Sequence, residues 1–474
     1  MSLEVSPSLP AASECLDVRW FSEFKEIGGF QSHSLLEVSS KARESQKAAF
    51  LAGEILNPSF SYEKLDAGEL AVSEKALLDL KQRIKTEEEN PTVKHLYLWK
   101  INEKIAEARM LQATLGGDMR NFARYNRFIY GNPDKAVFTH TLTSLTKKLG
   151  EAKQSPDVDS QQAAEELEAV LPKVDLAENE NEITPPPENV FLALRESVRV
   201  NFEGLLGLTD AEKKKYSSKD LKQIFEEALR EIGIEEGWEV MVDLDKAVIS
   251  VNSAENQIGI PPEKNYLLRR VKNLLVHEIG IHVKRNLEGG KSKLKLLSLG
   301  LDRYTRGEEG IATLAGKLAE NPKAFEEYEM LDRQFAIGLE VGIDGKKRDF
   351  RGVFEIMQKY YFFEEMQSCA KLKDPEKQAA RKAKAFAKSC DKAWLRCYRS
   401  FRGSDCKTPG VCFAKDIAYA EGNIATWYLL GKNQELLGKL TLGKFDQTNP
   451  RHLKALFALQ IGGITEADLA ALGK

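Results

Sequence analysis

The first third of the chain has the hydrophobic repeat of helices. Segments 73–90 and 95–117 carry apolar residues at mixed three- and four-residue spacings, which is typical of amphipathic α-helices. Stretches rich in Gly, Pro, Asn and Ser interrupt the pattern at 57–62, 116–122 and 130–133, as expected of turns. We therefore predict a helical N-terminal region over residues 19–150.

Two segments lack this pattern. Residues 1–18 are irregular and contain Ser, Pro and Ala, so we predict a flexible N-terminus. Residues 151–188 are polar and acidic and close on three consecutive prolines. This composition predicts a linker with one short helix between the N-terminal region and a C-terminal domain over 189–474.

The C-terminal domain begins with a mixture of helix and strand. We predict a helix from about Lys219 behind an N-cap serine, and strands over 238–243 and 246–261, where β-branched residues alternate or form runs. A long helix should then run from Pro261 and Pro262 to the glycine pair at 289–290. Beyond Glu308 the pattern is again mostly helical. The predicted fold class is α+β, predominantly helical, with a small β-sheet.

Charge and composition exclude several classes of protein. Lys and Arg number 69 against 72 Asp and Glu, so the overall charge gives no reason to expect nucleic acid or an anionic membrane as partner. No stretch approaches the roughly 20 apolar residues of a membrane helix. The N-terminus lacks a basic segment followed by an apolar one, so no secretory signal is recognisable and a cytoplasmic location is expected.

The cysteines form a C-terminal group without a metal-binding spacing. None of them is in C-x-x-C, and an oxidising compartment is not expected, so reduced structural thiols are favoured over disulfides or a thiolate zinc site. The six cysteines are Cys15, Cys369, Cys390, Cys397, Cys406 and Cys412.

The sequence HEIGIH on the long helix holds two histidines with an unusual spacing. In the familiar H-E-x-x-H motif the histidines are four residues apart and share a helix face. Here His277 and His282 are five apart, which an ideal helix would place on different faces. A single π-bulge would restore a common face, and such bulges are frequent at functional sites. Gly280, inside the insertion, would ease the distortion.

This spacing predicts a catalytic zinc site with one ion per chain. Two His and one carboxylate are a standard zinc ligand set, and either Glu308 or Glu309, at the start of the next helix, could complete it by spacing. Glu278, adjacent to the first His, would be the general base that takes a proton from water activated by the metal. The alternative is that H-E-x-x-x-H arose by chance and that its histidines are structural.

The motifs HEIGIHV and GEEGIA resemble those of the zinc peptidase family that includes the microtubule-associated tyrosine carboxypeptidases and their bacterial relatives. In that family the first position of the second motif varies, which implies Glu309 as the ligand and Glu308 as its neighbour. Segments 57–62, 122–133 and 399–422 also look like family segments, and the resemblance extends from about Asn57 to about Leu440. It implies a gluzincin-like metallopeptidase domain that is predominantly helical.

The resemblance implies a zinc-dependent carboxypeptidase that removes a C-terminal residue, aromatic or tyrosine-like, from a peptide or protein. Eukaryotic members of the family act on the C-terminal tyrosine of α-tubulin, so a tubulin-like acidic tail is one possible substrate. Those members carry long basic N-terminal extensions for their microtubule partner. The stretch before Val18 is short and not basic, so we do not expect a stable microtubule interaction through such a tail.

A carboxypeptidase needs a cation for the free α-carboxylate, which Arg binds bidentately. Arg399, Arg402 and Lys415 are the candidates because their segments match the family, and each could instead be solvated or in a structural ion pair. Further candidates are Lys284 and Arg285 for the carboxylate, Tyr304, Tyr360 and Tyr419 for the oxyanion, and strand 257–261 for pairing with the peptide.

Two other functions fit the same motifs. The first keeps the zinc but changes the bond that is cut, as in an endopeptidase or a dipeptidyl-peptidase. The second is a non-catalytic helical module that binds a partner, with zinc structural or absent. The glutamate beside the first histidine argues against the second, because a structural metal site has no use for a base.

Overall fold

The computed structural model describes most of the chain. The described residues are 15–28, 30–173, 183–184, 188–210, 212–244, 246, 248–253, 255–262, 264–320 and 330–472. The predicted flexible N-terminus lies outside these ranges up to residue 14.

The predicted N-terminal region is helical. Its described residues form α1 (Val18–Ile27), α2 (Ser32–Leu35), α3 (Ser40–Leu51), α4 (Ala67–Glu87), α5 (Pro91–Leu115), α6 (Met119–Tyr130) and α7 (Lys135–Lys153). Several of these helices begin at a polar cap. The side chains of Asp66, Asn90, Asp118 and Asp134 each accept hydrogen bonds from the first free backbone N–H groups of α4 to α7, which is what fixes these helix starts.

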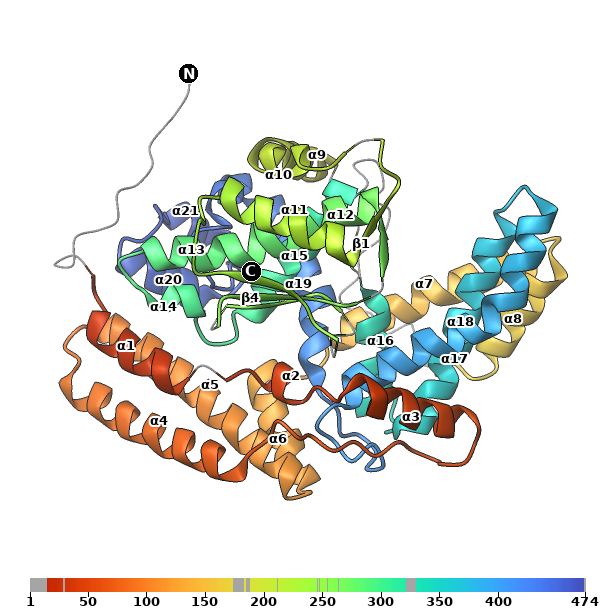
Figure 1. Cartoon of the computed structure of the whole chain (residues 1–474), viewed down its shortest axis with the longest axis horizontal. Coiled ribbons are helices and arrows are strands. Elements are labelled where there is room, and N and C mark those ends of the chain that lie inside the picture. The colour runs from red at the N-terminus through yellow and green to blue at the C-terminus, as the bar shows by residue number, and fades with distance from the viewer. Residues whose placement is uncertain are drawn as a thin grey trace.

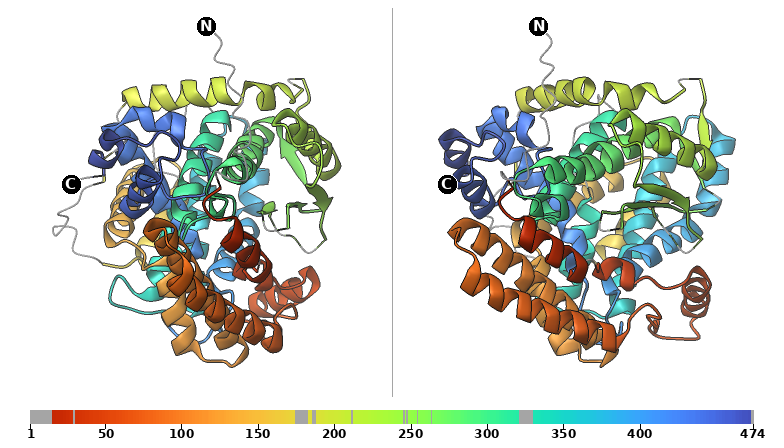
Figure 2. Two further views of the ribbon diagram at one scale, coloured as in Figure 1. Left: turned by 90° about the vertical axis from the view of Figure 1, so that its left-hand side faces the viewer. Right: turned by 60° about the vertical axis from the view of Figure 1, so that its left-hand side comes forward.

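The N-terminal helices share a hydrophobic core with the end of the chain. Trp20, Phe24 and Tyr97 are buried in one cluster with Leu297 and Phe445. Figures 1 and 2 show the red and orange N-terminal helices against the green and dark-blue C-terminal elements. Burial of such large side chains contributes about 1.5–3 kcal/mol each, so the two regions stabilise one another.

The predicted linker is helical and packed over part of its length. Helix α8 (Val158–Glu168) buries Ala163 and Leu167 against Phe363 and Met366, and α7 continues to Lys153. The rest of the linker, including the three prolines, falls largely on residues 174–182 and 185–187, which lie outside the described residues.

The C-terminal domain starts with the predicted helix and a set of short strands. Helix α9 (Glu188–Asn201) and α10 (Glu203–Gly207) precede β1 (Lys215–Ser217) and α11 (Ser218–Glu231). Ser217 and Asp220 form a reciprocal capping box at the start of α11. The N-cap serine and the helix predicted from about Lys219 are therefore confirmed.

Two small sheets follow, and their order corrects one prediction. Strands β1 and β5 (Asn265–Leu267) pair antiparallel. In the other sheet the order is β2 (Glu239–Val242), β4 (Gln257–Ile260), β3 (Ser250–Asn252), with β4 parallel to β2 and antiparallel to β3. Because β4 is paired on both edges, the predicted pairing of strand 257–261 with a substrate peptide is wrong.

The helix that carries the two histidines is divided into three parts. It consists of α12 (Leu268–Leu274), the π-helix η3 (Leu275–Val283) and α13 (Lys284–Lys291). The predicted end near residue 290 is confirmed, but the predicted start at Pro261 and Pro262 is wrong, because residues 265–267 extend to pair with β1.

The remaining described residues are again helical. They form α14 (Leu296–Leu299), α15 (Thr305–Glu320), α16 (Leu331–Val341), α17 (Phe350–Ala370), α18 (Pro375–Phe401), η4 (Ala414–Asp416), α19 (Ile417–Lys432), η5 (Gln434–Lys439), α20 (Pro450–Ala458) and α21 (Glu466–Ala470). All six cysteines are free thiols, and five of them are buried, in agreement with structural roles. Among the helices that the structure describes, none is both long and apolar enough to cross a bilayer.

Gly280 is required for packing and not for backbone freedom, because it lies in the π-helix without a positive φ. A Cβ at this position would lie 2.7 Å from Cε1 of Phe202, a buried side chain between α9 and α10. We expect Gly280→Ala to lower the free energy of unfolding by about 1–3 kcal/mol through overpacking. In a Phe202→Ala background the same change should lower the free energy of unfolding by less. Denaturant titration of the wild type, the two single variants and the double variant would measure this difference. Equal costs in both backgrounds would contradict the steric explanation.

Candidate active site

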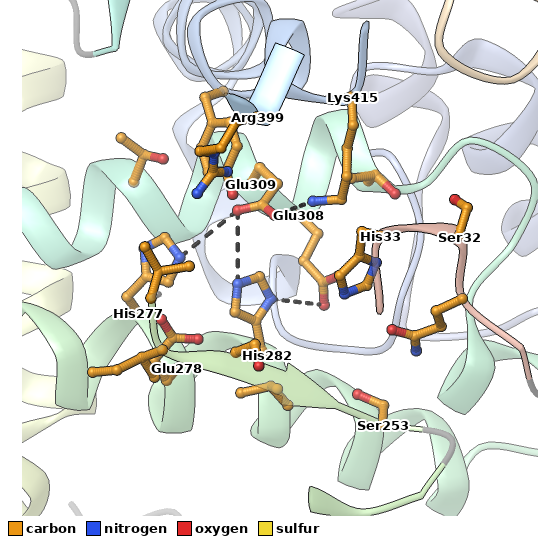
Figure 3. Close-up of a pocket in the computed structure, with 18 of the residues that line it drawn as sticks. Ser32, His33, Ser253, His277, Glu278, His282, Glu308, Glu309, Arg399 and Lys415 are labelled. Atoms are coloured by element: carbon orange, nitrogen blue, oxygen red, sulfur yellow. Dashed lines mark hydrogen bonds and ion pairs between the residues drawn. The ribbon is translucent and has the colours of Figure 1, made fainter. Parts of the chain in front are cut away.

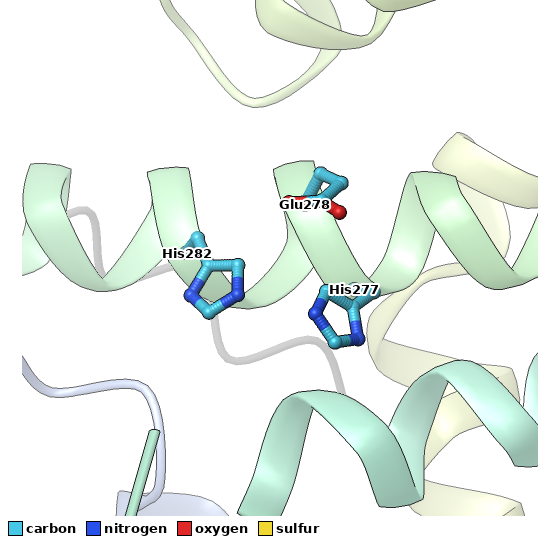
Figure 4. Close-up of side chains that lie close together, drawn as sticks. All are labelled: His277, Glu278 and His282. Carbon is cyan, nitrogen blue, oxygen red and sulfur yellow. The ribbon is translucent and has the colours of Figure 1, made fainter. Parts of the chain in front are cut away.

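The π-helix η3 brings the two histidines to one face, as Figure 4 shows. In a π-helix the backbone hydrogen bonds join residues five apart, so His277 and His282 lie one turn from each other. Their ring centroids are 4.9 Å apart. The predicted distortion is confirmed, and it extends over the nine residues of η3 instead of one bulged turn.

Glu309 approaches both imidazoles from α15. Its Oε2 lies 3.7 Å from Nε2 of His277 and 3.7 Å from Nε2 of His282, and Figure 3 shows it on the other side of the rings from Glu278. The same oxygen is buried and has no hydrogen-bond partner among the described residues. An unpaired buried carboxylate oxygen is costly, and a cation between the three side chains would satisfy it.

The distances fit a zinc ion. Bonds of about 2.0–2.2 Å in a tetrahedral site place neighbouring ligand atoms about 3.4 Å apart, close to the observed separations. Two imidazole nitrogens and one carboxylate oxygen are a known ligand set for catalytic zinc. His277, His282 and Glu309 could therefore hold the predicted metal.

Glu308 lies behind this set. Its Oε1 is 3.5 Å from Nδ1 of His282, the nitrogen that faces away from Glu309, and 3.2 Å from Nζ of Lys444. Burial would raise the pKa of Glu308, but Lys444 and His282 outweigh it and lower that pKa. A carboxylate on the second nitrogen of a metal-binding histidine orients the ring and increases its basicity. Glu308 is placed for that role and not as a ligand.

Glu278 lies beside the two histidines, and ligand atoms of the three residues are within 4.8 Å of one another. The residue is buried, and burial raises the pKa of its carboxyl group to about 7. A carboxylate with such a pKa is a better proton acceptor than an exposed glutamate. Its position and environment suit a general base.

The charges around the histidines favour a bound cation. Burial lowers the pKa of His277 to about 3, so this ring is neutral, as a metal ligand must be. Burial also opposes protonation of His282, yet Glu308, Glu309 and Glu278 together raise its pKa. The surplus negative charge at this end of the cluster therefore attracts either a proton or a metal ion.

The cluster opens into a cavity of about 520 Å³. Its wall is built from distant parts of the chain: α2, β3 and the segment before it, η3, α15 and the region from α18 to α19. Figure 3 shows His33 and Ser32 on α2 facing the same space as Lys415 and Arg399. A cavity of this size accepts a few residues of a peptide.

All three cations predicted for the substrate carboxylate line this cavity, but their charged groups are occupied. Arg399 donates two hydrogen bonds of 2.8 Å to the carboxylate of Asp416. Arg402 is buried and donates to the backbone carbonyl of His33 at 3.3 Å. Lys415 contacts Oε1 of Glu309 at 3.4 Å. The sequence placed these three cations near the site, but it did not predict the groups with which they pair.

The further candidates divide into two groups. Tyr304 and Tyr419 line the cavity and stay candidates for the oxyanion. The other three are not among the residues that line the cavity. Lys284 lies over the ring of Phe202, Arg285 donates to the carbonyls of Gly443 and Phe445, and Tyr360 donates to Glu364.

His33 and Arg333 are among the residues of the cavity wall that the sequence did not identify. No other metal-binding residue is near His33 in the chain, and only the tertiary fold brings α2 to the same cavity as η3. Arg333 stands at the start of α16 without any neighbouring motif. Neither has a local signal that could have identified it.

The position of α15 depends on a close crossing with α19. A Cβ on Gly310 would lie 2.4 Å from the backbone of Gly422, and one on Gly422 would lie 1.9 Å from the carbonyl oxygen of Arg306. The two helix backbones are therefore in direct contact next to Glu309, which explains the glycine that follows the acidic pair.

Comparison with known proteins supports the resemblance inferred from the motifs. Residues 204–371 match the family described as microtubule-associated tyrosine carboxypeptidase. The match is narrower than the range of 57–440 expected from the sequence. It includes η3 and α15, but not α2, Arg399, Arg402 or Lys415 of the cavity wall. No curated protein and no solved structure matches the chain. The matched residues include His277, Glu278, His282, Glu308 and Glu309, so the whole candidate metal cluster lies in the part of the chain that is similar to the microtubule-associated tyrosine carboxypeptidase family.

Proposed function

We propose that this protein is a zinc-dependent carboxypeptidase that removes one C-terminal residue, tyrosine or a similar aromatic, from a peptide or protein. One observation carries the proposal: the unpaired, buried Oε2 of Glu309 is equally distant from Nε2 of His277 and Nε2 of His282, with Glu278 beside them. A metal held there would be next to a base and open to the cavity.

Bound zinc would supply Lewis acidity, which eases deprotonation of water and polarises the scissile carbonyl. The chain supplies the proton transfers. Glu278 accepts the proton of the attacking water, whose oxygen bonds to the carbonyl carbon, and then delivers that proton to the leaving amine nitrogen as the C–N bond breaks. Glu308 holds His282 in orientation through Nδ1. Tyr304 or Tyr419 would donate to the oxyanion.

The charge of the cavity favours an acidic peptide. His33 is buried, and its burial and the positive charges of Lys415, Arg402, Lys246 and Arg399 lower its pKa well below the usual value. The cavity is lined by 12 Lys and Arg side chains against 7 Glu side chains, so positive charge remains after the internal ion pairs are counted, and it attracts peptide carboxylates. A tubulin-like acidic tail is therefore our proposed class of protein substrate.

The edge strand β3 gives a second reason to expect a peptide. Ser250 and Val251 line the cavity, and β3 is paired only with β4 among the described strands. An extended peptide could add to the outer edge of β3 by β-augmentation. This edge replaces the prediction that β4 would pair with the substrate.

The test is mass spectrometry of a peptide mixture incubated with the zinc-loaded wild type and with Glu278→Gln. The mixture contains acidic peptides that end in Tyr, Phe, Leu and Lys. We expect the wild type to remove a single C-terminal residue, with Tyr or Phe preferred. Glu278→Gln should be at least about 100-fold slower, since general acid–base catalysis contributes about 10²- to 10⁴-fold.

Other products would identify the alternative functions. Internal cuts, or dipeptides released from the N-terminus, would keep the zinc chemistry but replace the carboxypeptidase by an endopeptidase or a dipeptidyl-peptidase. No product from a protein that contains stoichiometric zinc would favour the non-catalytic module.

A further inference from the structure

The guanidinium of Arg333 lacks the partners that the other arginines of the cavity have. Its Nε and Nη1 are buried and have no hydrogen-bond acceptor among the described residues, and the residue lines the cavity. A buried charged donor without an acceptor is costly, because it has lost its hydrogen bonds to water and gained none in return. A ligand that provides an anion would remove this cost.

Tyr419 fixes the plane of this guanidinium. The Cζ of Arg333 lies 3.8 Å from the centroid of the Tyr419 ring, and the Nζ of Lys415 lies 5.7 Å from the same centroid. Lys415 in turn contacts Glu309. Stacking on an aromatic face leaves the N–H groups, which point outward in the guanidinium plane, free for bidentate bonds.

The carboxylates near Arg333 are already used. Asp416 accepts both bonds of Arg399 and lies 3.5 Å from Arg396. Asp332 accepts a bond of 2.6 Å from Arg396 and a second from Tyr361. Among the residues that the structure describes here, three arginines therefore share two aspartates, which leaves an excess of one positive charge.

We propose that Arg333 binds the α-carboxylate of the substrate and so restricts cleavage to the C-terminal residue. A peptide α-carboxylate has the single negative charge and the two parallel oxygens that the free guanidinium accommodates. Arg399 and Arg402 then have a supporting role. Arg399 neutralises Asp416, so that Asp416 does not form an ion pair with Arg333. Arg402 holds the backbone at His33 through its hydrogen bond to the carbonyl oxygen. This inference rests on the proposed function, since an endopeptidase would have no need of a carboxylate anchor.

The test measures binding, with cleavage blocked by Glu278→Gln in the full-length, zinc-loaded protein. Two peptides of the same acidic sequence end in Tyr, one with a free carboxylate and the other with a C-terminal amide. Calorimetry should find the acid bound about 10- to 100-fold more tightly than the amide, as expected for a charged bidentate interaction. Adding Arg333→Ala should reduce the affinity for the acid peptide to that for the amide peptide and leave the affinity for the amide peptide unchanged. Arg333→Lys should retain part of the difference between the two affinities.

The control is Arg124→Ala in the same background. Arg124 is exposed and stacks on Tyr125 at 5.7 Å, outside the cavity, so its loss should leave both affinities unchanged. Zinc content is measured for every variant, so that loss of metal is not read as loss of the anchor.

The outcomes separate this inference from the proposed function. A full preference for the acid in the Arg333→Ala variant, together with C-terminal trimming by the wild type, would overturn the role of Arg333 alone. Equal binding of acid and amide by the Glu278→Gln parent, or no binding of either, would overturn the role of Arg333, and the products formed by the wild type would decide separately whether the proposed function stands.

Discussion

Glu309→Gln is expected to abolish stoichiometric zinc binding. The amide oxygen of glutamine carries no charge, and Glu309 is the carboxylate whose unpaired Oε2 faces both histidines. The loss should exceed the roughly 10- to 100-fold in metal affinity that removal of an outer partner costs. Glu308→Gln, which removes the carboxylate beside Nδ1 of His282 and Nζ of Lys444 but no metal ligand, should fall within that smaller range. Elemental analysis and competition with a zinc chelator would measure both variants.

The matched control is Glu151→Gln, on the exposed side of α7, which should keep full zinc content. Circular dichroism of each variant shows whether the helices are retained. If Glu309→Gln kept wild-type affinity while Glu308→Gln lost the metal, the roles of the two glutamates would be exchanged. If both variants kept the metal, the ion would bind elsewhere.

The grouping of His277, Glu278, His282 and Glu309 was predictable because its information is local. His277 and His282 share one helix, and a spacing of five residues has one simple helical solution, the π-helix observed over η3. Glu309 stands near the start of α15, the next long helix along the chain. Such features depend on periodicity and short separations in the chain, which a single sequence contains.

The cavity wall was less predictable because it depends on tertiary pairing. Arg399 was correctly placed near the site, yet its bidentate bond to Asp416 depends on how α18 meets η4. The helix start at Leu268 instead of Pro261 has a similar cause, since pairing of β5 with β1 overrides the helix-starting preference of the prolines. For strand 257–261 the sequence did contain a usable signal. The apolar end of β4 is typical of a central strand, and a central strand has no free edge with which a substrate peptide could pair.

The crossing of α15 and α19 leads to the second large expected effect. Gly310→Ala and Gly422→Ala should each lower the free energy of unfolding by at least about 2 kcal/mol, near the upper end of the usual cost of overpacking. The reason is that the new methyl would meet backbone and not a movable side chain, at 2.4 Å from Gly422 and at 1.9 Å from Arg306. Backbone contacts are relieved only by separating the two helices. Thermal or denaturant unfolding with and without zinc would measure the loss.

The same substitutions should also weaken zinc binding, because Glu309 belongs to α15 and is displaced when α15 is pushed away from α19. This coupling distinguishes them from Gly280→Ala, which meets the ring of Phe202 and can be accommodated by a side-chain shift. Gly150→Ala is the control: Gly150 is exposed in α7 and has nothing within 4 Å of an added Cβ, so alanine there should be neutral or stabilising by up to about 1 kcal/mol. If Gly310→Ala retained both its stability and its zinc affinity, α15 would be free to shift without moving Glu309. The ligand set would then be held by its own side-chain contacts and not by the glycine crossing.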